Sequence, residues 1–141
     1  TRAGRVIPLT SPYRALDTRQ ASFGGVPLGP AQAEDWSFAA FAASVNIDNI
    51  SVGNQAALIG NLTNASLGRL YPTVKVEPGF LTVYPADQPT LPVISNLNNY
   101  ESAAVPNMAL IKYGADQTVR VYNASGYAHY ILDVSAVVLA D

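Results

Sequence analysis

Two carboxylates and one arginine have the residue types that could support catalysis: Asp17, Arg19 and Asp133. Glycoside hydrolysis uses two carboxylates roughly 5 to 10 Å apart, on either side of the bond to be cleaved. An arginine beside them would act as an electrophilic group. In a β domain, a carboxylate buried beside arginine more often forms a bidentate ion pair. We therefore expect these residues to tie the N-terminal segment to the last strand and to have a structural role.

His129 is the only histidine of the chain, and the sequence contains no cysteine. A zinc site needs several histidine, cysteine or carboxylate ligands at a suitable spacing, and His129 lacks a second histidine or a local cluster of carboxylates. Serines are plentiful, but none lies in the Gly-x-Ser-x-Gly turn that presents a nucleophile in hydrolases. We therefore expect no catalytic residues, no metal and no cofactor, and we interpret the protein as one that is not an enzyme.

Three asparagines, Asn96, Asn98 and Asn107, form a second polar group. Amides both donate and accept hydrogen bonds, so these side chains suit sugar hydroxyls, and the eight tyrosines of the chain would supply stacking faces. Asparagine at the end of a strand also caps backbone groups in turns. We favour the capping role and group the three asparagines with the ion pair above as a structural polar network.

The composition is poor in charge. Charged residues make up 13% of the 141 residues and hydrophobic residues 49%, against about 25% charged residues in ordinary domains. This composition suits a surface that neighbours cover, and it equally suits a β-rich core with many alanines. A net charge of −2 gives no basic footprint for nucleic acid. The apolar runs are too short to span a bilayer, so neither nucleic acid nor a membrane is an expected partner.

The first half of the chain gives mixed signals. Residues 1–12, with Pro8 and Pro12, predict an extended arm, and the glycines and prolines of residues 23–30 predict a loop. Residues 36–45 favour a strand that runs on into residues 45–50, although the alanines leave a short helix open. Residues 54–62 favour one helical turn or a compact loop.

The second half gives clearer strand signals, since β-branched and aromatic runs alternate with proline and glycine turns. Residues 114–117 predict a hairpin-like turn. The expected strands are residues 73–76, 80–84, 93–97, 109–113, 118–122 and 128–139. Short strands spaced in this way predict an all-β single domain over residues 13–141, preceded by the arm. The architecture is a jelly-roll-like β-sandwich or a closely related barrel.

Several short boxes resemble a β domain of actinobacterial cell-surface and secreted proteins and of virion proteins of actinobacteriophages. The matching boxes occur in the same order: YRALDTR at residues 13–19, GG and PLGP at 24–30, VNI at 45–47, GFLTVYP at 79–85, SNLN at 95–98, VPN at 105–107, VRVYN at 119–123 and AHYILDV at 128–134. The chain departs from the family pattern in an inserted loop at residues 48–77 and in the ending at residues 135–137. The features particular to this protein are therefore expected in the insertion and in the arm.

This resemblance implies a non-enzymatic module. Because no export signal precedes the domain, we expect a structural protein of an actinobacteriophage virion, made in the host cytoplasm. A capsid decoration or accessory (cement) protein is favoured over a tail part. It would act as a homo-oligomer, for which a trimer is one form, and would contact the major capsid protein or other virion proteins. The alternative is a module that binds glycans or the cell wall, in a phage tail or in a secreted actinobacterial protein, with localisation at the cell surface.

Overall fold

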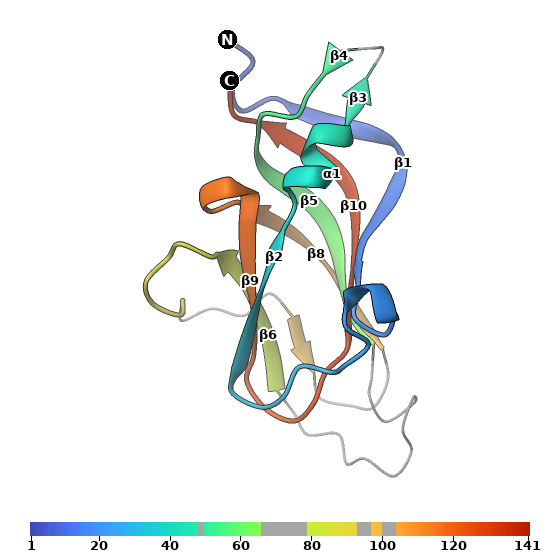
Figure 1. The fold of residues 1–141 in the computed structure, drawn as a ribbon, viewed down its shortest axis with the longest axis vertical. Coiled ribbons are helices and arrows are strands. Elements are labelled where there is room, and N and C mark those ends of the chain that lie inside the picture. The colour runs from blue at the N-terminus through green and yellow to red at the C-terminus, as the bar shows by residue number, and fades with distance from the viewer. Residues whose placement is uncertain (48–49, 66–78, 93–96, 100–103) are drawn as a thin grey trace.

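A computed structural model describes residues 1–47, 50–65, 79–92, 97–99 and 104–141. It shows two four-stranded antiparallel sheets that pack face to face as a β-sandwich (Figure 1). The first sheet has the order β1-β10-β5-β8, and the second has the order β2-β9-β6-β7. Neither sheet closes on itself in the described part, so the sandwich is confirmed and the related barrel is wrong.

Each sheet is built from four strands. The first sheet contains β1 (Val6–Asp17), β10 (Tyr130–Leu139), β5 (Gln55–Asn64) and β8 (Val105–Lys112). The second contains β2 (Gln32–Ser37), β9 (Thr118–Asn123), β6 (Gly79–Pro85) and β7 (Leu97–Asn99). The remaining elements are the hairpin of β3 (Asn46–Ile47) and β4 (Ile50–Ser51), the helix α1 (Ala39–Ser44), and the 3-10 turns η1 (Ala21–Phe23) and η2 (Ala115–Gln117).

The strand order is that of a jelly roll. Leaving the small β3–β4 hairpin aside, the first sheet strand pairs with the last, the second with the seventh, the third with the sixth and the fourth with the fifth. This nesting is a long hairpin rolled into two sheets, which gives the two Greek keys of the fold. The two chain ends consequently lie side by side, and the Gly4 N–H donates to the Leu139 carbonyl at 2.8 Å (Figure 1).

Alternation of side chains builds the core between the sheets. On β10, Tyr130, Leu132 and Val134 point inward, and a register shift after Val134 resets the alternation, so that Val137 and Leu139 also point inward. The strands predicted at residues 80–84, 118–122 and 128–139 are confirmed as β6, β9 and β10. One hydrophobic core joins both sheets.

The largest error of the sequence interpretation concerns residues 48–77. We expected an inserted loop there, with one helical turn or a compact loop at residues 54–62. Instead, residues 55–64 form β5, a ten-residue strand between β10 and β8. The outward-facing residues Ala57 and Ile59 of this strand are apolar, so it shows no clean polar alternation, and its small and amide residues gave no strand signal. Residues 66–78, including the strand predicted at 73–76, lie outside the described residues.

The interpretation of residues 36–45 as a strand is only partly right. Strand β2 ends at Ser37, and residues 39–44 form the short helix that the alanines had left open. Alanine has the highest helix propensity, and Phe41 and Ala42 anchor this single turn in the core. Residues 1–12, which we expected to form an extended arm, are partly a strand of the first sheet, because Val6, Ile7 and Pro8 pair with β10.

Candidate functional site

Asp17 and Arg19 form a bidentate ion pair at the end of β1. The Arg19 Nε donates to Asp17 Oδ1 at 2.8 Å, Nη2 donates to Oδ2 at 2.8 Å, and the Arg19 backbone N–H donates to Oδ1 at 3.2 Å. The Asp17 residue is 2% exposed. These hydrogen bonds hold the pKa of Asp17 below its ordinary value, although burial opposes them. Asp17 is therefore an anchored carboxylate and has no free oxygen to offer a substrate.

We expected Asp133 to pair with Arg19, but in the structure it pairs with another arginine. Its partner is Arg14, which lies directly opposite it on β1. The Arg14 Nε lies 2.9 Å from Asp133 Oδ1, and Nη2 lies 3.3 Å from Oδ2. Arg14 also lies 3.8 Å from Asp17 Oδ2 through Nη1. An ion pair therefore does join the N-terminal segment to the last strand, but its arginine is Arg14 and not Arg19.

A buried hydroxyl and the single histidine lie beside this network. Thr18 Oγ1 is 3.0 Å from His129 Nδ1 and accepts a hydrogen bond from the Tyr130 N–H at 3.0 Å. Burial disfavours the imidazolium and lowers the pKa of His129. A threonine, a histidine and an aspartate have the chemical types of a nucleophile, a base and an orienting acid. Thr18 and His129 are 1% exposed, so the cluster lies in the interior of the fold.

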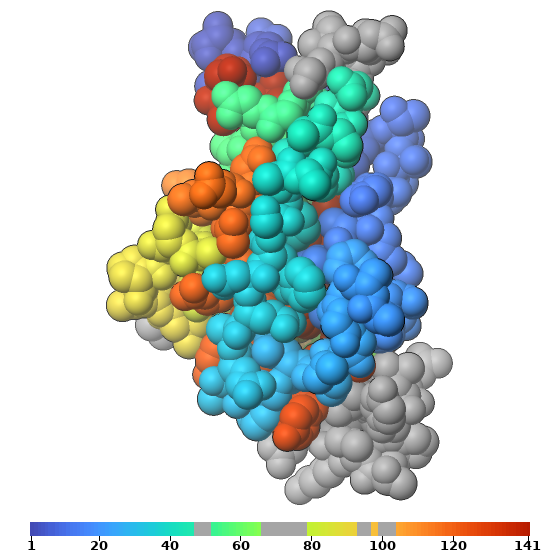
Figure 2. Space-filling view, in the orientation of Figure 1, coloured from blue at the N-terminus to red at the C-terminus, as the bar shows by residue number. Residues whose placement is uncertain are grey.

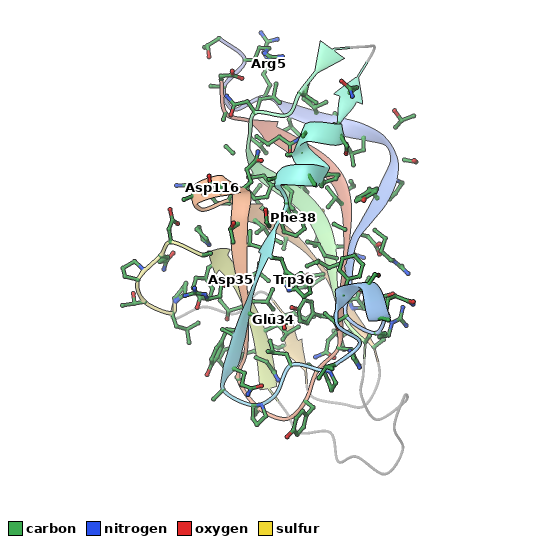
Figure 3. The ribbon with its side chains drawn as sticks, viewed as in Figure 1. Arg5, Glu34, Asp35, Trp36, Phe38 and Asp116 are labelled. Atoms are coloured by element: carbon green, nitrogen blue, oxygen red, sulfur yellow. The ribbon has the colours of Figure 1, made fainter. Side chains whose placement is uncertain are left out.

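A second polar cluster links the two sheets, and the sequence analysis missed it. The Trp36 Nε1 on β2 donates to the Tyr130 hydroxyl on β10 at 2.6 Å, and that hydroxyl donates to the Glu34 carboxylate. Glu34 and Trp36 are two residues apart on β2 and point to the same side of that strand, whereas Asp35 points to the other side (Figure 3). Burial, together with the hydrogen bond to Glu34, raises the pKa of Tyr130. No sequence signal marks a contact between residues so far apart.

The two described asparagines of the expected polar network lie on different sheets. Asn98 is an exposed residue of β7, in the second sheet, and Asn107 is exposed on β8, at the edge of the first sheet opposite the β1 edge. Asn96 lies outside the described residues. A different asparagine has the buried capping role: the Asn123 side chain donates to the carbonyls of Leu28, Gly29 and Gly126.

A shallow groove lies where β1 separates from β10. The register of β1 shifts between Pro8 and Tyr13, and the freed segment borders the end of α1. The Tyr13 ring stacks on Phe41, with centroids 5.0 Å apart and planes at 16°. The groove has a volume of about 210 Å³ and is lined by Leu9, Thr10, Ser11, Tyr13, Phe41, Ser44, Val45 and Asn46. Hydroxyls around a half-exposed aromatic ring suit a small polar ligand with one apolar face.

The outer, solvent-side face of the β1-β10-β5-β8 sheet is apolar over much of its area. The register places Val6, Val138, Ala57 and Lys112 in one row across the four strands. The next row contains Pro8, Ala136, Ile59 and Leu110. We call these two rows, together with Met108, the apolar face. Side chains opposite one another on neighbouring strands share a face. Lys112, at one corner, is the only charge in the two rows, whereas the row that contains Met108 also contains Asn61, Asp133 and Arg14.

The apolar face is strongly exposed at its two borders, on β1 and β8, whereas Ala57 and Ala136 between them are buried. Met108 is 72% exposed, Leu110 65% and Val6 52%. Large exposed apolar patches on soluble proteins mark binding surfaces more often than chance exposure. Figure 2 shows the molecule from the side on which β1 (blue) and β2 (cyan) lie in front.

Further properties bear on function. Among the described residues, no three histidine, cysteine, aspartate or glutamate side chains gather closely enough to hold a metal ion. No helix in the described ranges is long and apolar enough to cross a membrane.

Comparisons of the chain with protein-family models, with curated proteins and with solved structures found no match. The resemblance described for the sequence boxes therefore stays an expectation drawn from the residues themselves.

Proposed function

We propose that this chain is a non-enzymatic structural protein of an actinobacteriophage virion, most simply a capsid decoration protein that cements the shell. The observation that carries the proposal is the apolar face, which presents three strongly exposed apolar residues, Val6, Met108 and Leu110. Removing such surface from water is worth about 25 cal/mol per Å². A neighbouring virion protein, such as the major capsid protein, would supply the cover.

The fold and the polar clusters support this role. Jelly rolls build viral capsid domains and lectin domains, and a fold alone does not specify function. In this chain, the groups that could catalyse are sequestered: Asp17 is held by Arg19, and Thr18 and His129 are buried. Contact repeated on many symmetric copies stabilises a shell by linkage, without turnover.

Mass spectrometry of purified virions of the encoding phage tests the proposal directly. The expected result is a stoichiometric amount of this chain in the particle, and particles that lack it should break at a lower temperature. Absence from every particle would overturn the proposal. Presence in the particle would also support the expected localisation in the virion.

Variants then locate the contact. Val6→Asp combined with Pro8→Asp places two charges on the apolar face at its β1 border, where both residues are exposed. Binding of the purified variant to particles that lack the protein is expected to weaken at least about tenfold, because two charges would be buried without partners in the contact. The matched control is Val26→Asp, since Val26 is as exposed, at 67%, but lies in a loop outside both sheets.

The groove favours a second candidate function, a glycan- or cell-wall-binding module. Tyr13 offers an aromatic surface for a sugar ring beside the hydroxyls of Thr10, Ser11 and Ser44. If this role holds, Tyr13→Ala lowers retention of the protein on isolated actinobacterial cell walls, while Tyr127→Ala, at an exposed tyrosine elsewhere, does not. Equal retention of the wild type and Tyr13→Ala would exclude the groove as the binding site.

A further inference from the structure

We propose that β8 is a homodimerisation edge, at which two copies of the chain pair antiparallel to form one continuous eight-stranded sheet. This inference deepens the proposed function, on whose self-association it rests, by naming the strand that makes the contact. The hydrogen bonds between β8 and β5 are the first observation behind it. The Tyr113 N–H donates to the Ala56 carbonyl at 2.9 Å, just beyond the end of the strand pair.

The antiparallel pattern then fixes which groups face outward. Because residue 113 bonds to β5, the residues at every second position before it, including Ile111 and Ala109, also exchange hydrogen bonds with β5. The residues between them, Met108, Leu110 and Lys112, direct their N–H and carbonyl groups away from the sheet. Within the described parts of the chain, no strand or loop donates to or accepts from these outward groups.

The other three sheet edges are protected in ways that β8 is not. Natural proteins block edges with prolines, charges, bulges or short strands. At the opposite edge, β1 has two register shifts and contains two prolines. In the second sheet, β2 contains Glu34 and Asp35, and β7 is three residues long. By contrast, β8 pairs with β5 over eight residues without a register shift.

The blocking residues of β8 lie only near its two ends. Pro106 is the second residue of the strand and Lys112 the last. The residues between them contain no charge, no proline and no glycine. An open row of backbone donors and acceptors accepts only another extended backbone.

A second copy of β8 fits this row by symmetry. A twofold axis at Ala109 pairs the outward groups of Met108 with those of Leu110 in the other copy, and the reverse. Both side chains lie on the apolar face, so two apolar cross-strand pairs form at once. The axis residue is an alanine, whose small side chain allows the close approach of a pair without hydrogen bonds. Lys112 then lies opposite Pro106 of the other copy.

Charge and backbone chemistry select this register over its neighbours. Moving the axis toward the end of β8 brings the two Lys112 ammonium groups together, which like-charge repulsion disfavours. Moving it toward the start places Pro106 at a central position, where its missing N–H removes hydrogen bonds. The pairing centred on Ala109 keeps the two lysines apart and confines the missing proline N–H to the two ends of the pairing.

The dimer should be weak. Eight residues at about 3.4 Å each make an edge about 27 Å long, which buries well under the about 800 Å² per partner of a standard interface. We therefore expect dissociation in the micromolar range, at the weak end of specific association. An interface of this strength becomes effective when a shell holds many copies together.

Sedimentation equilibrium of the purified chain tests the edge. The wild type is expected to show a reversible monomer–dimer equilibrium. Leu110→Pro removes an outward N–H and leaves the bonds to β5 intact, so it should make the protein monomeric. The matched control is Asn61→Lys, on the same face and beside Met108 but on the interior strand β5, which should leave the dimer unchanged. Circular dichroism checks that both variants fold.

Cross-linking tests the register, because the chain has no cysteine of its own. An equimolar mixture of Met108→Cys and Leu110→Cys single variants should give more disulfide-linked dimer than either variant alone. A wild type that is monomeric throughout the micromolar range, a trimer, or a dimer that survives Leu110→Pro would overturn the proposal. None of these results removes the chain from the virion, so failure of the edge and failure of the proposed function are distinguishable.

Discussion

Arg14 and Asp133 face each other across β1 and β10, with the arginine Nε 2.9 Å from the aspartate Oδ1. A register shift at Ala15, between Arg14 and Leu16, puts Arg14 and Asp17 on the same outer face, although they are three positions apart. In a regular strand, side chains three residues apart would face opposite ways. The bulge is therefore what gathers Arg14, Asp17 and Asp133 into one cluster, while Arg19 closes back on Asp17 from the turn.

Replacing Arg19 by alanine is expected to destabilise the fold. The variant leaves Asp17, a buried carboxylate, without its two side-chain hydrogen bonds. Leaving a buried charge underpaired costs several kcal/mol when the pair is fully buried. Since Arg19 is about one-third exposed, we expect about 2 kcal/mol. Urea unfolding at pH 7 gives this free energy.

Arg120→Ala is the matched control for Arg19→Ala. Arg120 also makes two hydrogen bonds to an aspartate, Asp35, but both side chains are well exposed and solvent screens the pair. Its unfolding midpoint should stay close to that of the wild type. An unchanged midpoint for Arg19→Ala, or equal losses for both variants, would contradict the role given to Asp17.

The sequence predicted the second half of the fold better than the first. Strands β6, β9 and β10 are rich in β-branched and aromatic residues and are bounded by turn residues, so local signals sufficed. Strand β5 has no such composition: its Gly60 and its amides are compatible with a strand only because β10 and β8 flank it. The structure of β5 is determined by its position between two other strands, and the local sequence does not show that position.

The site residues were predictable to the same limited extent. The Asp17–Arg19 pair is local, two residues apart, and residue type was enough to expect an ion pair among Asp17, Arg19 and Asp133, but not to assign its partners. The Arg14–Asp133 contact depends on a bulge, and the Trp36–Tyr130 contact depends on how the two sheets face each other. The apolar face is a property of register across four strands, so the low charge content indicated its existence but not its place.

His129 should make stability depend on pH in a window where no other side chain titrates. Burial lowers the pKa of His129 below its ordinary value of 6.5. As the pH falls through 6.5, the unfolded chain therefore binds a proton before the folded protein does, and stability decreases. The slope is at most about 1.4 kcal/mol per pH unit for one proton. Urea unfolding between pH 7.5 and 5.5 measures it.

The variant His129→Gln is expected to abolish that slope, whatever its stability at pH 7. This is possible because the chain has a single histidine. An NMR titration of the wild-type imidazole gives an independent value if the variant folds poorly. A wild type whose stability is flat over this pH range would show that His129 is not held neutral by the fold.

Tyr130→Phe tests the polar link between the sheets. The change removes the hydroxyl that accepts from Trp36 and donates to Glu34, with almost no change in packing volume. We expect a loss of about 1 to 2 kcal/mol, because the indole N–H and the carboxylate lose a partner in a partly buried site. Thermal and urea unfolding measure it. Tyr127→Phe, at an exposed tyrosine, is the control and should be neutral, and equal effects would argue against the link.

Gly60→Ala tests whether β5 is part of the sheet or part of an inserted loop. A methyl group at residue 60 would lie 2.6 Å from the Asp133 carbonyl oxygen, which belongs to the backbone of β10 and cannot turn aside. Either β5 or β10 must shift, and overpacking of this kind costs about 1 to 3 kcal/mol. The exposed neighbour Asn61→Ala should cost little. In a surface loop both substitutions would be tolerated equally, so a neutral Gly60→Ala would remove β5 from the centre of the sheet and, with it, the interior strand on which the open edge of β8 depends.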